Sequence, residues 1–171
     1  MNGTWLDTYK QRDANVMQWI QNGFRTKWLD RWMPSLTQIG GTASVCAATI
    51  LLSLITHDHG FAIAVLLISH IIVHVLKKTL ARMRPYEACS EMIELRSEKM
   101  HDHSFPSGHT AATWTMCTQV MLAFPALAPV MFPIALFVGW SRMYLGLHYP
   151  SDVLAGMIVG SSVPMLLSFL N

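Results

Sequence analysis

The chain has 171 residues, of which 52% are hydrophobic and 13% are charged, and its formal net charge is +2. Soluble domains carry about a quarter charged residues, so this deficit indicates a protein whose solvent is partly lipid. The small net charge argues against nucleic acid as a partner, and the length predicts a single domain over residues 1–171. Three cysteines without a metal-binding spacing predict neither a disulfide framework nor a metal centre.

Residues 1–35 combine aromatic and charged side chains. This pattern predicts an amphipathic helix lying in the membrane interface, with its tryptophans at headgroup depth. A helix packed against the end of a bundle would show the same pattern. The apolar positions at roughly helical spacing are Trp5, Tyr9, Val16, Ile20, Phe24 and Trp28, and the charged residues between them include Lys10, Arg12, Asp13, Arg25 and Lys27.

The rest of the chain contains five apolar segments, most of them joined by short connections. Inside lipid only helices or closed barrels satisfy the backbone, and these segments lack the alternation of strands. At 1.5 Å per residue such segments can cross a bilayer as helices. We therefore predict an all-α, polytopic transmembrane bundle of about five spans plus the amino-terminal interfacial helix. The predicted spans cover residues 36–56, 60–76, 109–124, 126–147 and 153–170, with a polar loop over 84–106.

Cationic and imidazole side chains follow one face of the second span. The stripe contains His70, His74, Lys77 and Arg84, and Ala81 continues its helical spacing. Such groups near a bilayer usually face a cavity or a partner, so we expect the stripe to line a site. Two histidines four residues apart suit either metal binding or hydrogen-bonded packing, and no third ligand at useful spacing accompanies them. The cations expected to extend to headgroups instead are Lys78 and Arg82.

The stretch FPSGHT, residues 105–110, precedes the third span. Ser107 is a good N-cap for that helix, and Gly108 lets a ligand approach the backbone. A helix start offers free N–H groups and the positive end of a dipole, which suits a phosphate. A plain capped helix would have the same sequence, but His109 in the first turn favours a functional role.

The stretch SRMYLGLHYPSD, residues 141–152, joins the fourth and fifth spans. His148 and Asp152 are four residues apart, so the carboxylate can reach the imidazole and fix its tautomer. The other ring nitrogen then becomes a better nucleophile. Alternatively, Asp152 caps the fifth helix and Arg142 anchors headgroups.

The order of the spans brings these groups together. The ends of the second and fourth spans and the starts of the third and fifth lie on the same side of the membrane. Three cations, a helix amino terminus and two histidines suit a phosphoryl group in transfer. No acidic cluster is available for magnesium, so we expect no metal and no cofactor. The converging residues are Lys77, Arg84, Ser107, His109, Arg142, His148 and Asp152.

Three motifs resemble those of the type-2 phosphatidic acid phosphatase superfamily, which includes class A acid phosphatases and vanadium haloperoxidases. The pattern Lys-x6-Arg-Pro is matched by Lys77, Arg84 and Pro85, and Pro-Ser-Gly-His is matched by residues 106–109. The pattern Ser-Arg-x5-His-x3-Asp is matched within residues 141–152. The motifs span residues 77–152 in the family's order and spacing, whereas residues 1–35 lie outside the resemblance.

The resemblance implies a role for each matching residue. His148 would attack phosphorus to form a phosphohistidine, and Asp152 would orient His148. His109 would protonate the leaving oxygen and then activate water. The groups implied to hold the phosphoryl oxygens are Lys77, Arg84, Arg142, Ser107 and the Gly108 N–H.

The membrane setting selects the substrate class. A site at the interface suits a phosphate or diphosphate on a lipid: undecaprenyl diphosphate, phosphatidylglycerol phosphate or phosphatidic acid. The same residues would serve a lipid phosphotransferase, and a basic pocket alone would serve a non-catalytic lipid-phosphate binding or transport protein. The 12 lysines and arginines all fall on the site's side of a five-span bundle, which favours the cytoplasmic side. The resemblance instead implies a site on the extracytoplasmic face of the cell membrane, and we expect the site on that face.

Overall fold

The computed structural model describes residues 5–58 and 60–170, and the side chains from residue 11 onward within them. Every regular element in these ranges is helical, which confirms the predicted all-α class. The elements are α1 (Trp5–Gly23), α2 (Lys27–Leu36), the 3₁₀ turn η1 (Thr37–Gly40), α3 (Thr42–Thr56), α4 (Phe61–Leu80), α5 (Pro85–Ala88), α6 (Gly108–Ala123), the 3₁₀ turn η2 (Pro125–Leu127), α7 (Ala128–Tyr144) and α8 (Pro150–Ser168).

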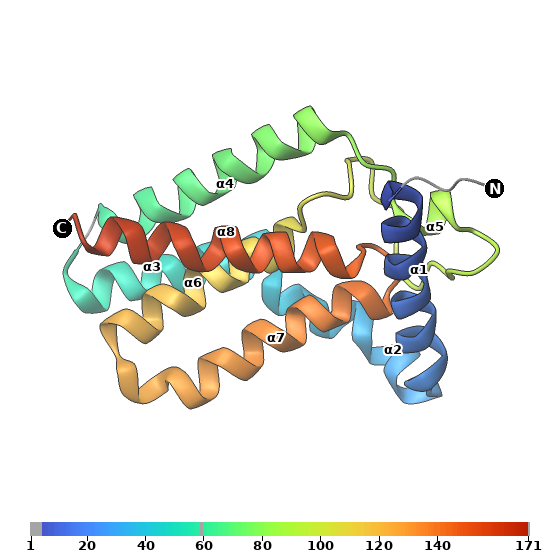
Figure 1. The fold of residues 1–171 in the computed structure, drawn as a ribbon. Helices are drawn as coiled ribbons and strands as arrows, with labels where there is room; N and C mark the ends of the chain where they lie inside the picture. Colours follow the sequence, from blue (N-terminus) through green and yellow to red (C-terminus); the bar gives the residue numbers. More distant parts are fainter. Residues whose placement is uncertain (1–4, 59, 171) are drawn as a thin grey trace.

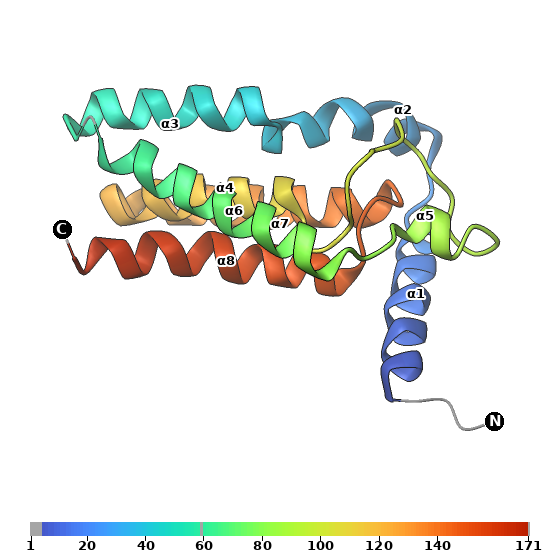
Figure 2. The same ribbon diagram turned by 90° about the horizontal axis from the view of Figure 1, so that it is seen from above.

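Five helices, α3, α4, α6, α7 and α8, run side by side in alternating directions (Figures 1 and 2). The ends of α4 and α7 and the starts of α3, α6 and α8 therefore lie at one end of the bundle. Helix α1 crosses that same end, roughly perpendicular to the bundle, and α2 and α5 lie there too. This end of the molecule carries the sequence motifs.

Helix α6 forms the centre of the bundle, because it contacts α3, α4, α7 and α8. It is buried around most of its circumference, and two of its threonines donate to its own backbone: Thr113 Oγ1 to the His109 carbonyl at 2.8 Å and Thr115 Oγ1 to the Ala111 carbonyl at 2.9 Å. The outer helices turn large apolar side chains outward, as expected for a bundle in lipid. Side chains more than half exposed include Leu51, Leu54, Leu67, Ile71, Val75, Val130, Leu154, Ile158 and Leu166.

The five predicted spans correspond to the five bundle helices, but their lengths differ. Within the described residues, Phe61–Ala88, Pro125–Tyr144 and Pro150–Ser168 are long and apolar enough to cross a membrane. The bent pair Lys27–Gly40 and Thr42–Thr56 gives a fourth such segment if it is taken as one span. Helix α6 has 16 residues, just below the range of about 17–25 for a span.

The amino-terminal region packs on the bundle and also exposes aromatic rings. On α1, Met17 and Ile20 are buried, and α1 contacts α7 and α8. In contrast, Trp19, Trp28 and Trp32 are between 46% and 66% exposed, so the interfacial role predicted for residues 1–35 remains a prediction. The side chains of Trp5, Tyr9 and Lys10, which belong to the same pattern, lie outside the described residues.

Two glycines let α6 and α8 approach closely. A Cβ atom on Gly156 would lie 2.7 Å from the Ser107 carbonyl oxygen, and one on Gly160 would lie 2.6 Å from Trp114 Cβ. Glycines four residues apart allow this backbone contact between helices in lipid. The contact fixes the start of α6 beside the start of α8, where Ser107 N–H donates to the Asp152 carbonyl at 3.0 Å.

Substituting Gly160→Ala is expected to destabilise the protein by about 1–3 kcal/mol, because the added methyl group overlaps helix α6. The thermal unfolding midpoint of the purified protein in detergent measures this effect. The matched control is Gly23→Ala, since a Cβ atom there meets nothing within 4 Å. Equal midpoints for the two variants would contradict close packing of α6 on α8.

Candidate active site

The motif residues gather at one end of the bundle. Lys77 lies in the last turn of α4 and Arg142 in the last turn of α7. His109 lies in the first turn of α6 and Asp152 in the first turn of α8. His148 lies in the loop between α7 and α8. The alternation of helix directions is therefore sufficient to bring together groups from four helices.

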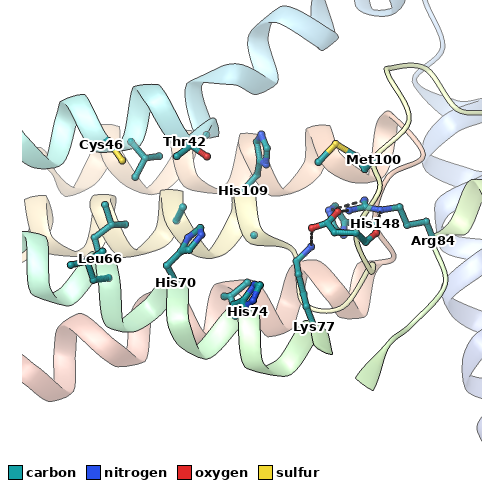
Figure 3. Close-up of a pocket in the computed structure, with 17 residues that line it drawn as sticks. Thr42, Cys46, Leu66, His70, His74, Lys77, Arg84, Met100, His109 and His148 are labelled. Atoms are coloured by element: carbon teal, nitrogen blue, oxygen red, sulfur yellow. Dashed lines mark hydrogen bonds and ion pairs between the residues drawn. The ribbon is translucent and has the colours of Figure 1, made fainter. Parts of the chain in front are cut away.

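A cavity of about 390 Å³ opens at this end and continues along α3 and α4 (Figure 3). Its polar part is lined by Lys77, Arg84, Gly108, His109 and His148. Its apolar part is lined by residues that include Val45, Cys46, Leu66, Leu67, Val73 and Ala112, and His70 and His74 line it on α4. Three further predicted residues, Ser107, Arg142 and Asp152, are buried and do not line the cavity.

The His148 imidazole is held in one tautomer by a backbone carbonyl. Its Nδ1 lies 2.8 Å from the Ser104 carbonyl oxygen, which can only accept, so Nδ1 carries the proton. Nε2 is then unprotonated, and it lies 3.3 Å from Nη1 of Arg84. Burial lowers the pKa of His148 to about 4 against the opposing effect of Asp152, with Arg84 and Arg142 adding to the lowering. The imidazole is therefore neutral near pH 7.

Asp152 is placed differently from the sequence-based expectation. Its Oδ2 lies 3.7 Å from His148 Nδ1, an ion-pair distance that is longer than a hydrogen bond. The same oxygen accepts from the Tyr149 N–H at 2.8 Å and from the Ser104 hydroxyl. Asp152 thus caps α8, as the alternative interpretation predicted, and the carbonyl of Ser104 makes the direct bond to the imidazole.

Two predictions about the end of α4 are wrong. Ala81 and Arg84 do not continue the helical stripe of His70, His74 and Lys77, and Arg82 does not extend toward lipid headgroups. The helix ends at Leu80, and Ala81 adopts a left-handed conformation with φ of 42°. The chain then turns inward, so Arg82 does not extend to headgroups. Its Nη1 donates to Asp152 Oδ1 and its Nη2 to Asp13 Oδ2, both at 2.8 Å.

Arg84 and Lys77 share one carboxylate, that of Asp102. Lys77 Nζ lies 2.6 Å from Asp102 Oδ2, and Arg84 Nη2 donates to Oδ1. Arg84 is 1% exposed, and it also donates to the carbonyls of Asp102 at 2.8 Å and Leu147 at 2.9 Å. Although partial burial alone would raise it, Lys77 and Arg84 lower the pKa of Asp102 to about 2. Asp102 therefore stays ionised on the two cations.

Arg142 retains unused hydrogen-bonding capacity. Its Nη1 donates to Thr37 Oγ1 at 3.1 Å, while its buried Nε has no hydrogen-bond partner among the described residues. A buried guanidinium N–H without a partner is costly. This donor is the kind of group that a bound anion would satisfy.

The amino terminus of α6 completes the polar end. Ser107 is its N-cap, as predicted, and its Oγ accepts from the Thr110 N–H and from the Thr110 hydroxyl at 2.9 Å. A Cβ atom on Gly108 would lie 3.9 Å from Lys77 Cε, so the backbone there faces the end of α4. The first N–H groups of this 16-residue helix form a positive dipole end suited to phosphate.

Four residues that contact the predicted site residues or Arg82 were not predicted from the sequence to do so: Asp13, Thr37, Asp102 and Ser104. Asp102 and Ser104 lie just before the FPSGHT stretch, but nothing in their spacing marks them. Ser104 contributes partly through its main-chain carbonyl, which any residue would supply. For His70 and His74 the sequence left metal binding and hydrogen-bonded packing as alternatives. The part of the chain that the structure describes supplies no third metal ligand beside them. Within residues 5–58 and 60–170, no group of three His, Cys, Asp or Glu side chains is arranged to hold a metal ion.

Comparison with known proteins identifies the family. The model of the PAP2 superfamily matches residues 58–168. The chain belongs to this superfamily. The resemblance based on the three motifs is thereby confirmed.

Three curated relatives illustrate the range of this superfamily. The chain is 35% identical over 106 residues to undecaprenyl-diphosphatase from Sulfolobus acidocaldarius, covering 59% of this chain and 51% of that protein. It is 27% identical over 165 residues to phosphatidylglycerophosphatase B of Bacillus subtilis, covering 85% and 75%. A lipid A 1-phosphatase from Rhizobium johnstonii is 31% identical over 57% of this chain and 41% of its own. The chain spans about half the length of the first and third of these relatives.

Two solved structures share the fold. A transmembrane PAP2 type phosphatidylglycerolphosphate phosphatase from Bacillus subtilis superposes with a TM-score of 0.78 at 22% identity, covering 96% of this chain and 86% of that one. LpxE from Aquifex aeolicus superposes with a TM-score of 0.77 at 25% identity, covering 89% and 92%. These likenesses confirm the predicted helical membrane architecture.

Acidification from pH 7 to pH 5 is expected to destabilise the wild type more than the variant His148→Gln. The folded imidazole stays neutral down to about pH 4, whereas the unfolded imidazole binds a proton near pH 6.5. The unfolded state therefore binds more protons in this window, and stability falls as pH falls. Thermal unfolding midpoints across the pH range measure the difference, and parallel pH profiles would contradict a buried, neutral His148.

Proposed function

We propose that this superfamily member is an integral membrane phosphatase that hydrolyses a phosphate monoester or diphosphate on a lipid. The observation that carries the proposal is the position of His148. Its unprotonated Nε2 lies at a cavity whose polar end contains Lys77 and Arg84 and whose other end is apolar. A phosphate group fits the first part, and an aliphatic chain fits the second.

In the first step, the Nε2 lone pair of His148 attacks phosphorus while the bond to the leaving oxygen breaks. His109 donates a proton to that oxygen, which departs as an alcohol or a lipid monophosphate. The imidazole gains a formal positive charge, which Asp152 stabilises from behind at 3.7 Å. General acid catalysis of this kind is worth about 10²–10⁴ in rate.

In the second step, water attacks the phosphohistidine and the phosphorus–nitrogen bond breaks. His109, now neutral, accepts the proton of the water, and inorganic phosphate leaves. Both steps concentrate negative charge on the phosphoryl oxygens. We assign their binding to Lys77, Arg84, Arg142, the Ser107 hydroxyl and the Gly108 N–H.

We further propose that the reaction needs no metal ion. Three cationic side chains and a helix amino terminus supply the positive charge that a metal would otherwise provide at the phosphoryl oxygens. The buried Nε of Arg142 provides a donor that is still unused. Among the described residues, the one carboxylate that lines the cavity, Asp102, is already paired with Lys77 and Arg84.

The apolar part of the cavity supports a lipid substrate. Its walls on α3 and α4 include Val45 and Leu66, apolar side chains that suit a lipid chain better than a soluble phosphate ester. Undecaprenyl diphosphate, phosphatidylglycerol phosphate and phosphatidic acid share the required chemistry. A phosphotransferase would use the same phosphohistidine with a lipid acceptor in place of water, whereas a binding or transport protein would not need the nucleophile.

We place this site on the extracytoplasmic face of the cell membrane. The resemblance implies this side, and the distribution of lysines and arginines favours the opposite one. Three of those cations, Lys77, Arg84 and Arg142, are accounted for by phosphate binding. Others form ion pairs within the fold, such as Arg96 with Asp30 at 3.4 Å.

Purified His148→Gln protein is expected to release no phosphate from any lipid phosphate or diphosphate that the wild type hydrolyses. The substitution removes the nucleophile, so orthovanadate, which mimics five-coordinate phosphorus, should also lose its inhibitory binding. Phosphate release across a panel of lipid substrates, with and without a chelator, is the measurement. Turnover by folded His148→Gln protein would refute the phosphohistidine route, and loss of wild-type turnover with chelator would refute metal independence.

Substituting Asp102→Asn is expected to lower the inhibition constant of inorganic phosphate. The anion then no longer competes with a carboxylate for Lys77 and Arg84, and a charge-assisted hydrogen bond of about 1.5 kcal/mol corresponds to about tenfold in affinity. Glu98→Gln is the matched control, because it removes the same charge from an exposed position of the same loop. Weaker phosphate binding by Asp102→Asn would mean that Asp102 instead holds the cations in place.

A further inference from the structure

Helix α1 reaches the candidate site through one buried carboxylate, that of Asp13. The side chain is about 8% exposed although it belongs to an amphipathic helix. Asp13 Oδ2 accepts from Arg82 Nη2 at 2.8 Å and from the Ser151 hydroxyl, and Oδ1 lies 3.3 Å from the Ser151 N–H. The Ser151 N–H is one of the free donors of the first turn of α8. Asp13 therefore caps α8 from a different helix.

Arg82 connects this carboxylate to the one behind the nucleophile. Its Nη1 donates to Asp152 Oδ1 at 2.8 Å and to Ser151 Oγ at 2.7 Å. Its guanidinium carbon lies 3.9 Å from the centre of the Tyr149 ring. The guanidinium is thus held by two carboxylates, a hydroxyl and an aromatic face. A planar guanidinium can make these contacts at the same time, because its N–H donors point outward in one plane while its face stacks on a ring.

We propose that Asp13 and Arg82 are positioning residues for the phosphoryl-transfer reaction. This inference rests on the proposed function. Together they fix the first turn of α8, and with it the Asp152 carboxylate behind His148. Neither Asp13 nor Arg82 lines the cavity, so both act through Asp152.

The charges explain why two carboxylates are needed. If Arg82 faced Asp152 alone, the pair would be neutral, and Asp152 could offer little to the positive charge that forms on His148. With Asp13 present, the trio of Asp13, Arg82 and Asp152 has a formal charge of −1. Asp152 Oδ2 lies 3.7 Å from His148 Nδ1, so in this buried setting the remaining negative charge interacts strongly with a phosphoimidazolium.

The same contacts assign a role to a part of the chain outside the family match. Asp13 lies in α1, whereas the superfamily model covers residues 58–168. Arg82 lies inside that range, between Lys77 and Arg84, at a position that the Lys-x6-Arg-Pro pattern leaves open. The amino-terminal helix is thereby linked to the chemistry through a pair of residues that the motifs do not specify.

The test compares Asp13→Asn with Asp30→Asn in the full-length purified protein. Asp30 is the matched control, because it is also an amino-terminal carboxylate paired with arginine, and its partners Arg25, Arg96 and Tyr144 lie outside α8. We expect Asp13→Asn to lower kcat by about ten- to hundredfold through misplacement of Asp152, with KM unchanged. Asp13→Glu should recover part of the loss, and Asp30→Asn should keep the wild-type kcat.

The dissociation constants of two anions distinguish a positioning role from general damage to the cavity. Inorganic phosphate reports ground-state binding, whereas orthovanadate reports the state in which His148 is bonded to the anion. For Asp13→Asn we expect the vanadate dissociation constant to rise by the same factor as kcat falls, while that of phosphate stays unchanged. Tryptophan fluorescence measures both constants without any turnover. Arg82→Lys keeps the positive charge but loses the planar set of N–H donors, so it should behave like Asp13→Asn. It replaces Asp13→Asn in the test if that variant does not fold.

Equal kcat values and equal vanadate affinities for Asp13→Asn and Asp30→Asn would overturn the inference. Parallel weakening of phosphate and vanadate would also overturn it, since that result indicates a disturbed cavity. Failure of the proposed function has a different signature, namely turnover or vanadate binding that survives His148→Gln. The two failures are therefore distinguishable in the same set of variants.

Discussion

The structure has to hold several positive charges close together at the end of an apolar bundle, and the surrounding architecture follows from this constraint. Arg84 and Arg142 are both almost completely buried, where unpaired charges are very costly. Backbone carbonyls around Arg84 and the Asp102 carboxylate offset much of that cost. Among the described residues, the Arg142 guanidinium has only the Thr37 hydroxyl as a hydrogen-bond partner, which leaves positive charge at the polar end for the anion proposed to bind there.

The loops serve to bring backbone carbonyls and carboxylates to these charges. The segment from Asp102 to Ser104 contacts Lys77, Arg84 and His148 within three residues. The loop between α7 and α8 adds the Leu147 carbonyl beside Arg84. Both loops are anchored on helix ends, which gives the imidazole a defined orientation on a rigid scaffold. An imidazole held in one tautomer and at one angle would need little reorganisation in the nucleophile role proposed for His148.

Sequence reasoning predicted the parts that depend on local pattern. The apolar runs predicted the bundle helices, and the alternation of their directions predicted that one end carries Lys77, His109, Arg142 and Asp152, which lie in the last or first turns of their helices. Ser107 was predicted as an N-cap because that role needs only a hydroxyl before a helix.

The remaining features depend on where the chain turns. The left-handed conformation of Ala81 turns Arg82 inward, and an alanine gives no sign that it will adopt it. Asp13 and Asp102 are acidic residues among many, and their partners are 69 and 25 residues away in sequence. Pairings over such separations are set by the packed fold, so a single sequence does not reveal them.

The glycine contact between α6 and α8 has a consequence for where the protein tolerates variation. His109 and Asp152 stand at the starts of these two helices, and the helices meet backbone to backbone at Gly156 and Gly160. A side chain at either glycine would overlap α6, and at Gly156 the overlap is with the Ser107 carbonyl, close to His109 in the sequence. Residues that do not line the cavity therefore constrain the geometry of the candidate site through the packing of α6 on α8.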